Sequence, residues 1–227
     1  MECEVLVVGA GVSGLATADQ LGPDAHVVII EAGKRVGGRL RSIDGLDLGA
    51  SWFWPGEHRV ATLVDELGIP THLQHLDGDA LYDAPDGVAR LEGNPVDVPS
   101  SRFSSGADDL TEALRRRISE RNGSDLLLDS HVQTVESTDA EHRPLVVTAT
   151  TAGVTRSISA DHVVLAVPPA LAASTIEFRP PLPDEVTRLA LRTPVWMGTT
   201  TKVVARYETA FWRDAGLSGS AVSHMGP

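Results

Sequence analysis

The sequence predicts an α/β fold with a parallel sheet, and three observations near the N-terminus support it. Val5 to Val8 is a continuous apolar run of mostly β-branched residues, which is typical of a strand buried on both faces. A glycine-rich loop follows, and then a helical segment from about Gly14 to Leu21. Val27 to Ile30 is a second buried apolar run, so the three pieces together predict a βαβ unit.

Apolar periodicity and turn residues predict the remaining elements. A helix is expected from about Glu57 to Leu67, and another from Ala107 to Arg121, where the apolar side chains share one face. Turn residues at Asp86-Gly87 and Gly93-Asn94-Pro95 indicate hairpins. Strands are further predicted near residues 40–48 and at 126–128, 132–135, 145–150, 154–158, 163–167 and 199–207, with one more helix after the proline-rich segment 180–183.

The composition excludes several classes of protein. Acidic side chains outnumber basic ones by 31 to 19, and the net charge of −12 argues against nucleic acid as a partner because it repels phosphates. Cys3 is the only cysteine, so neither an internal disulfide nor a cysteine-rich metal site can form. The acidic N-terminus is unlike a signal peptide, and the apolar run Val5 to Ala18 is too short to span a bilayer. We therefore expect a cytoplasmic protein that binds neither nucleic acid nor a membrane.

The loop after the first predicted strand carries a dinucleotide-binding pattern. Residues 9–14, GAGVSG, match G-x-G-x-x-G between a buried strand and a helix, where glycines allow a tight turn and close approach to a pyrophosphate. Glu31 ends the second strand, where an acidic residue is expected to accept a hydrogen bond from a ribose hydroxyl. NAD and FAD share this unit. Residues 36–39, VGGR, are by themselves a surface turn, but beside the glycine loop they favour a second pyrophosphate contact.

Longer segments resemble a known family. Residues 9–18 (GAGVSGLATA), 31–42 (EAGKRVGGRLRS) and 47–57 (DLGASWFWPGE) resemble the successive FAD motifs of the flavin-containing amine oxidases, the family of monoamine and polyamine oxidases. Matching segments then follow in the family's order at residues 105–110 (SGADDL), 131–135 (HVQTV), 161–168 (DHVVLAVP) and 201–212. The resemblance therefore covers most of the chain and implies FAD as the cofactor.

The resemblance also implies roles for individual residues. It assigns cofactor binding to Gly9, Gly11, Ser13, Gly14, Glu31, Ala32, Gly38, Arg39, Ala50, Ser51, Trp52 and Val132. In this mapping residues 9–14 hold the pyrophosphate and Glu31 binds the adenosine ribose. Arg39 reaches the phosphates or the ribityl chain, residues 50–52 line the flavin, and Val132 contacts the adenine.

Lys202 is the candidate catalytic residue. The chain has 17 arginines but only two lysines, Lys34 and Lys202, so a lysine stands where an arginine would be the default cation. A compact ammonium group fits a tight pocket and can hold one water, which a guanidinium fork does less well. By itself the sequence leaves a solvated lysine equally open. The resemblance implies the flavin-facing lysine that holds a water against flavin N5.

Three other groups of side chains are less specific. His72 and His75, with nearby aspartates, fit no standard metal-ligand spacing, so no metal site is predicted. The aromatic run at residues 52–54 either packs in a loop or walls the active site. The arginines at residues 115–117 are interpreted as a solvated helix face.

The resemblance implies oxidation of an amine at its C–N bond, by hydride transfer from the carbon that bears the amine to flavin N5, with O₂ as the acceptor. Two alternatives stay open. A desaturase or protoporphyrinogen-oxidase type of FAD enzyme would act on C–C bonds of an apolar substrate. A non-catalytic FAD-binding fragment or subunit would need a partner chain.

The predicted domains alternate along the chain. Residues 1–75 and 106–190 are expected to form the FAD-binding domain, with a short substrate-domain insertion at 76–105 and the start of the substrate domain at 191–227. The insertion is shorter than the helical one in the large monoamine oxidases. The chain ends before the family's C-terminal part, so the 227 residues alone are expected to be inactive, and a second chain is one possible source of that part.

Overall fold

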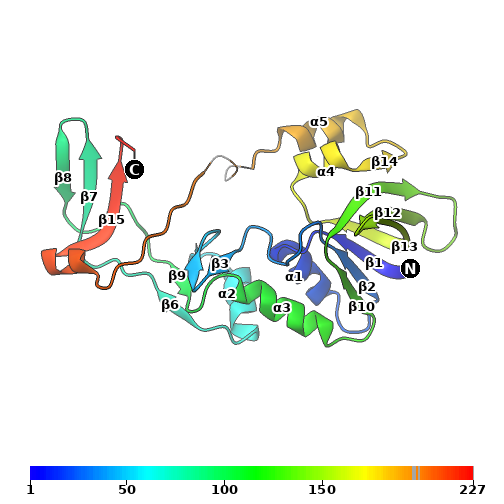
Figure 1. Cartoon of the computed structure of the whole chain (residues 1–227), viewed down its shortest axis with the longest axis horizontal. Coiled ribbons are helices and arrows are strands. Elements are labelled where there is room, and N and C mark those ends of the chain that lie inside the picture. Colours follow the sequence, from blue (N-terminus) through cyan, green and yellow to red (C-terminus); the bar gives the residue numbers. More distant parts are fainter. Residues whose placement is uncertain (196–197, 199, 227) are drawn as a thin grey trace. The chain divides into compact units, whose positions relative to one another are not determined.

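The computed structural model describes residues 1–195, 198 and 200–226. The chain forms two compact units, which are coloured along the sequence in Figure 1. Unit 1 consists of Met1–Ser42 with Asp108–Lys202, and unit 2 of Ile43–Ala107 with Val203–Pro227. The domain boundaries predicted from the sequence are at residues 75, 105 and 190. In the structure, residues 43–75 belong to unit 2 and not to the unit that contains the N-terminus.

The described residues of unit 1 include a seven-stranded sheet and four α-helices. Its strands are β1 (Glu2–Val8), β2 (Val27–Ile30), β10 (Ser124–Leu127), β11 (Ser130–Ser137), β12 (Leu145–Thr151), β13 (Val154–Leu165) and β14 (Glu177–Arg179). Its helices are α1 (Val12–Gln20), α3 (Asp109–Ser119), α4 (Pro169–Thr175) and α5 (Asp184–Arg192). Figure 1 shows α1 and α3 together on one side of the sheet.

The sheet has a parallel part and an antiparallel part. The strand order is β10-β2-β1-β13-β12-β11-β14. The first four strands pair in parallel, and β13, β12 and β11 pair antiparallel. The predicted βαβ unit is β1-α1-β2, and the second segment of the unit adds β10 and β13 on its two sides. These observations confirm the α/β fold with a parallel sheet.

Several details of unit 1 differ from the prediction, among them the short strand β14, which was not expected. Strand β13 is one continuous strand, whereas two strands at 154–158 and 163–167 were expected. Its first half pairs with β12 and its second half with β1, so the polar residues Asp161 and His162 lie inside a strand that changes partner and do not interrupt it. Helix α4 was not predicted. It begins with Pro169 in its first turn, a position that suits proline because no intrahelical N–H is needed there.

The core of unit 1 explains why the first two strands could be found from sequence. Residues 27–30 of β2 are all buried, as are residues 5–8 of β1. The core cluster continues through Val147 and Ile158, which show no exposed surface. A central strand covered on both faces has no polar face, so its sequence is a continuous apolar run.

Unit 2 is made of short strands and two short helices. Its elements are β3 (Ser42–Ile43), β4 (Leu46–Asp47), β5 (Trp52–Phe53), α2 (His58–Glu66), β6 (Thr71–Leu73), β7 (Asp79–Ala84), β8 (Gly87–Leu91), β9 (Ser101–Phe103), the 3₁₀ helix η2 (Phe211–Ala215) and β15 (Leu217–Ser223). The sheets are β3-β4, β5-β9-β6 and β15-β7-β8. The hairpin expected around Asp86-Gly87 is β7-β8, and its mixed sheet includes the parallel strand β15.

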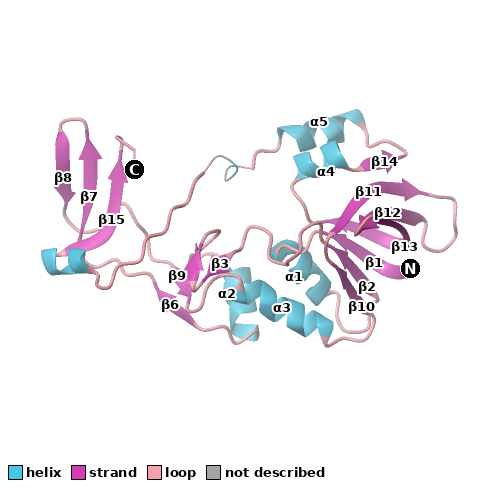
Figure 2. Ribbon diagram, in the orientation of Figure 1, coloured by secondary structure: helices cyan, strands magenta, loops and turns pink. Residues whose placement is uncertain are grey.

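The strand predicted at residues 199–207 is wrong where the structure describes it. Residue 199 lies outside the described residues, and residues 200–207 are loop, as Figure 2 shows by its colouring. A strand needs a neighbouring strand to take its backbone hydrogen bonds. The sheets formed by the described residues do not include this segment, so its β-branched sequence has no ladder to join.

Candidate functional site

The glycine loop between β1 and α1 has the geometry of an anion cradle. Gly9 adopts a φ of +103°, and a Cβ atom there would lie 2.7 Å from the carbonyl oxygen of Ala166. A Cβ on Gly14 would lie 1.9 Å from the carbonyl oxygen of Gly9. Gly11 differs, because it has an ordinary extended conformation and a Cβ on it would meet no atom within 4 Å. Two glycines are therefore required by packing, whereas Gly11 keeps a space open at the helix N-terminus.

That open space lies at the N-terminus of α1. Gly11 is the N-cap of α1 and provides no side-chain hydrogen bond to the first turn, in which Ser13 is exposed. The first N–H groups of any helix have no intrahelical acceptor, and the helix dipole adds partial positive charge there. The arrangement suits a phosphate or pyrophosphate.

Glu31 joins the glycine loop to the end of β2. Its Oε2 accepts a hydrogen bond from the Ala10 N–H at 2.8 Å, and its Oε1 accepts one from the Gly33 N–H at 2.7 Å. The side chain is half-buried, and Ala32 beside it is exposed. Each carboxylate oxygen keeps a further lone pair, so the group is fixed in place and can still accept hydroxyl donors.

The turn at residues 36–40 packs against the glycine loop. The Gly37 N–H donates to the carbonyl oxygen of Ala10 at 2.8 Å, and Gly37 forms a bridge with Gly11. Gly38, with a φ of +54°, places a would-be Cβ 3.3 Å from the Cα of Gly11. Arg39 follows and is exposed. The two glycine segments, which are separate in sequence, therefore form one surface.

Val132 lies in β11, which follows β10 closely in sequence although the two strands are near opposite ends of the strand order. The N–H groups of Asp129 and Ser130 donate to the carbonyls of Gly33 and Glu31, at 2.9 and 3.0 Å, so this corner is tied to the segment after β2. Val132 is half-buried against the core cluster, and a β-bulge follows it in the pairing with β12. Glu31 and the start of β11 are thus held on one edge of unit 1.

The other predicted flavin-lining residues belong to unit 2. Ala50 is exposed, and Ser51 is buried with its hydroxyl donating to the carbonyl of Gly49 at 3.3 Å. Trp52 is 45% exposed in β5, and its ring meets that of Trp54 edge to face at a centroid distance of 6.4 Å. Phe53 between them points the other way and packs on Phe103. The aromatic run therefore has one core residue and two exposed rings.

Lys202 is the last residue of unit 1 and is exposed. It lies in the loop that replaces the predicted strand, so the alternation of faces on a strand does not apply to it. Its flavin-facing role continues to rest on the resemblance and on the rarity of lysine.

Comparisons with known proteins add to this geometry. Residues 96–226 match the model of the family described as flavin containing amine oxidoreductase, and residues 7–67 match that of an NAD(P)-binding Rossmann-like domain. The first match covers more than half of the chain, and the second contains the glycine loop, Glu31 and the turn at 36–40.

The chain belongs to the flavin-containing amine oxidoreductase family. It is therefore an oxidoreductase of a family that uses FAD, as the motifs at residues 9–57 implied.

Individual proteins that are similar to this chain include other flavin-dependent oxidases. Putrescine oxidase of Kocuria rosea is 29% identical over 97% of the chain and 67% of that protein. Mitochondrial protoporphyrinogen oxidase of Nicotiana tabacum is 37% identical, but over only 56% of the chain and 27% of that protein. Among solved structures, wild-type putrescine oxidase bound to putrescine shares the fold, with a TM-score of 0.76 and 22% identity over 98% of the chain and 70% of that structure.

The residues of unit 1 fit the adenosine and pyrophosphate parts of FAD. The fit rests on the space left at Gly11 at the N-terminus of α1, and on a fixed carboxylate one strand away. A side chain at Gly11 would fill that space, and an apolar residue at 31 would remove the acceptor that a ribose hydroxyl needs.

The structure also shows contributors that the sequence analysis missed. The Arg35 guanidinium donates to the carbonyls of Val36, Leu40 and Gly38, at 2.8, 2.9 and 2.8 Å, and so fixes the turn. Nothing in the sequence distinguishes Arg35 from its neighbouring arginines. Asp47 is buried and accepts a hydrogen bond from the Ala107 N–H at 2.7 Å. Asp47 lies in a motif that carries the family resemblance, but its hydrogen bond joins segments that are distant in sequence.

The interpretation of residues 115–117 as a solvated face was wrong for Arg117. This side chain forms an ion pair with Asp19 of α1, which also pairs with Arg121 at 2.6 Å. Asp19 is only 5% exposed, so Arg117 of α3 and Arg121 just after that helix compensate a buried charge on the helix that begins at the glycine loop.

No helix of the described residues combines the length and the apolar character that crossing a membrane requires.

Proposed function

We propose that this chain binds FAD through unit 1 and that the complete protein oxidises an amine at its C–N bond. The observation that carries the cofactor proposal is the contrast between the glycines. Packing explains Gly9 and Gly14, whereas the open position of Gly11 at the N-terminus of α1 leaves room for a phosphate. FAD, when bound, accepts the hydride from the carbon that bears the amine and passes the electrons to O₂.

The residues proposed to hold FAD act as fixed hydrogen-bond partners. The N–H groups of residues 11–14 bind the pyrophosphate, and Glu31 accepts from the adenosine ribose while Ala32 lies beside it. The turn with Gly38 covers the phosphates, and Arg39 supplies a positive charge to them. Val132 contacts the adenine, and Ala50, Ser51 and Trp52 line the flavin. Lys202 is proposed to hold a water against flavin N5 by a hydrogen bond from its ammonium group.

The substitution Gly11→Ala tests the cofactor proposal directly. Because the backbone is extended and the space is empty, we expect the chain to keep its circular dichroism spectrum and its urea midpoint. A methyl group in the phosphate space should lower FAD affinity by roughly tenfold or more, measured by titration of flavin fluorescence. Gly56→Ala is the matched control, since it is also a glycine without a positive φ and with open surroundings. Unchanged FAD affinity in Gly11→Ala would contradict the proposal.

Amine oxidation is tested separately on the complete protein. Putrescine is the first substrate to try, because relatives are named for it. We expect loss of the oxidised-flavin absorbance on anaerobic mixing with an amine, followed by its return on admission of O₂. Reduction by a porphyrinogen but by no amine would favour the second candidate, which the similarity to protoporphyrinogen oxidase supports. FAD binding without reduction by either would indicate a non-catalytic FAD-binding subunit.

A further inference from the structure

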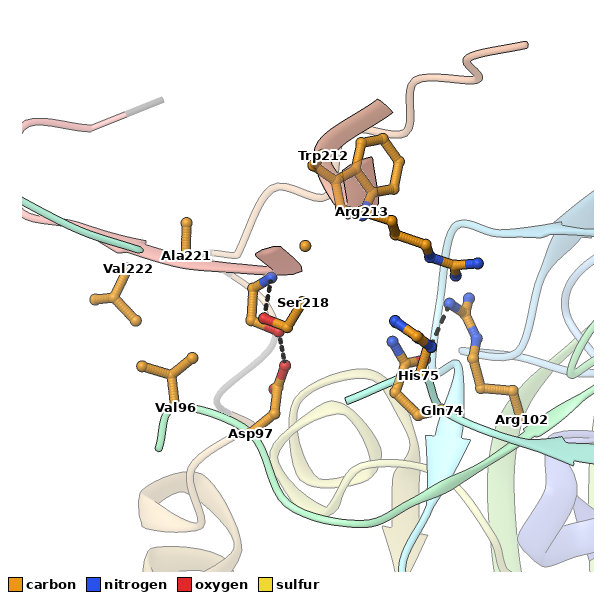
Figure 3. Close-up of a pocket in the computed structure, with 12 residues that line it drawn as sticks. Gln74, His75, Val96, Asp97, Arg102, Trp212, Arg213, Ser218, Ala221 and Val222 are labelled. Atoms are coloured by element: carbon orange, nitrogen blue, oxygen red, sulfur yellow. Dashed lines mark hydrogen bonds between the residues drawn. The ribbon is translucent and has the colours of Figure 1, made fainter. Parts of the chain in front are cut away.

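Unit 2 contains a cavity of about 480 Å³, to which none of the proposed FAD-binding residues contributes (Figure 3). It lies among residues of β15, η2, β9 and the segments around residues 74 and 96, all within unit 2. The size is that of a pocket for a small organic molecule and exceeds what an inorganic ion needs. Its apolar lining includes Trp212 next to Arg213, and Val96 and Val222 on the side of Asp97 (Figure 3).

Close packing builds this wall. Gly219 has a φ of +93°, and a Cβ atom on it would lie 2.7 Å from Nε1 of Trp212. The indole can therefore lie against the backbone of β15 only because residue 219 is glycine. The ring of Trp212 is also fixed by edge-to-face contacts with Tyr207 and Phe211, at centroid distances of 6.1 and 5.2 Å. The aromatic wall is thus a defined part of the structure.

Two arginines stand on one side of the cavity. Figure 3 shows the side chains of Arg102 and Arg213 extending into the same region, beside His75 and Gln74. Arg102 is held by Gln74 at 3.4 Å and lies 3.8 Å from a carboxylate oxygen of Asp47. Within the described part of the chain, the ion pairs do not include Arg213. Arg102 already faces the Asp47 carboxylate, so a bound anion would chiefly offer an ion-pair partner to Arg213.

An acidic group stands on the other side. In Figure 3, Asp97 lies away from the arginines, next to Ser218. Its Oδ2 accepts a hydrogen bond from the hydroxyl of Ser220, whose oxygen in turn accepts from Nδ2 of Asn94 at 2.9 Å. This chain of donors positions the Asp97 carboxylate and leaves its second oxygen for a ligand.

The charges are therefore separated across the cavity. A guanidinium fork matches a carboxylate, and an aspartate matches an ammonium. We propose that this cavity binds a small amino carboxylate, with its carboxylate between Arg102 and Arg213, its carbon chain along Trp212 and its ammonium at Asp97. A dicarboxylate would place a negative charge at Asp97, and a diamine would place a positive charge at the arginines. Both should bind more weakly, because a like-charge contact is unfavourable.

Isothermal titration calorimetry of the purified chain with two sets of ligands, of four and six carbon atoms, tests the proposal. The four-carbon set is γ-aminobutyrate, butyrate, succinate and putrescine, and the six-carbon set contains the corresponding compounds. Inorganic phosphate is a further probe. We expect the amino carboxylates to bind at a single site and at least about tenfold more tightly than the other ligands. No FAD is present, so failure here leaves the flavin proposal untouched, and failure of flavin binding does not affect this measurement.

Variants locate the site. Arg213→Gln should weaken binding of the amino carboxylate by roughly tenfold to a hundredfold, as for a lost charge-assisted hydrogen bond. Arg213 is exposed, so its loss should not unfold the chain, which circular dichroism will check. Arg59→Gln is the control, because Arg59 is exposed in the same unit and outside the cavity. Asp97→Asn should reduce the preference over butyrate. The proposal is overturned by absence of amino carboxylate binding at millimolar concentration, by unchanged binding in Arg213→Gln, or by phosphate or putrescine binding as tightly.

Discussion

Removal of the Glu31 carboxylate should have two separable effects. The carboxylate accepts hydrogen bonds from the N–H groups of Ala10 and Gly33, at 2.8 and 2.7 Å, so it stabilises the empty chain as well as a bound ribose. A hydrogen bond to a charged group contributes about 1.5–3 kcal/mol, and the half-buried position reduces this. We expect Glu31→Ala to lower the free energy of unfolding by about 2–4 kcal/mol. Where the chain stays folded, we expect the same substitution to weaken FAD binding by about 1–3 kcal/mol.

Glu31→Gln sharpens the test. A glutamine has one acceptor oxygen and one NH₂ group, so either Ala10 or Gly33 would face a donor. We therefore expect Glu31→Gln to lose most of the stability that Glu31→Ala loses, although it keeps the volume. Urea unfolding followed by circular dichroism measures the stability, and a flavin titration measures the affinity. Glu141→Gln, at an exposed loop position of unit 1, controls for the change in net charge. A Glu31→Gln chain as stable as the parent would refute the assigned hydrogen bonds.

Three further predictions concern other sites. Asp19→Asn should lower the free energy of unfolding by about 3–5 kcal/mol, measured in urea, because it leaves Arg117 and Arg121 without their buried partner. Burial raises the pKa of the Cys3 thiol to about 11, so at pH 9 the folded chain should react with iodoacetamide far more slowly than the unfolded chain. The same shift in pKa makes the free energy of unfolding depend on pH. The contribution of the thiol to that free energy is full below about pH 8.5 and should be lost as the pH rises towards 11. In the complete protein, Lys202→Met should slow flavin reduction or reoxidation in stopped flow with normal FAD content, and unchanged rates for both half-reactions would return Lys202 to the role of a solvated side chain.

Local patterns determined the first βαβ unit. The buried strands at 5–8 and 27–30, the glycine loop and Glu31 follow one another within a short stretch of chain, and within it β1 pairs with β2 and Glu31 accepts from Ala10. Hydrophobic periodicity and backbone conformation report such contacts directly, because each residue's environment is set by near neighbours in sequence. For the same reason the β7-β8 hairpin could be predicted from Asp86-Gly87.

Contacts between distant segments were decided only by the tertiary structure. Asp19 meets Arg117 and Arg121 across about a hundred residues, and no local pattern marks either partner. The continuity of β13 depends on two different neighbours, β12 and β1, that lie far apart in sequence. The segment around Lys202 has the composition of a strand, yet residues 200–207 join no sheet of the described chain, because a strand exists only where another offers its backbone groups. The charges across the cavity of unit 2 likewise come from segments around residues 97, 102 and 213, and only folding places them around one space.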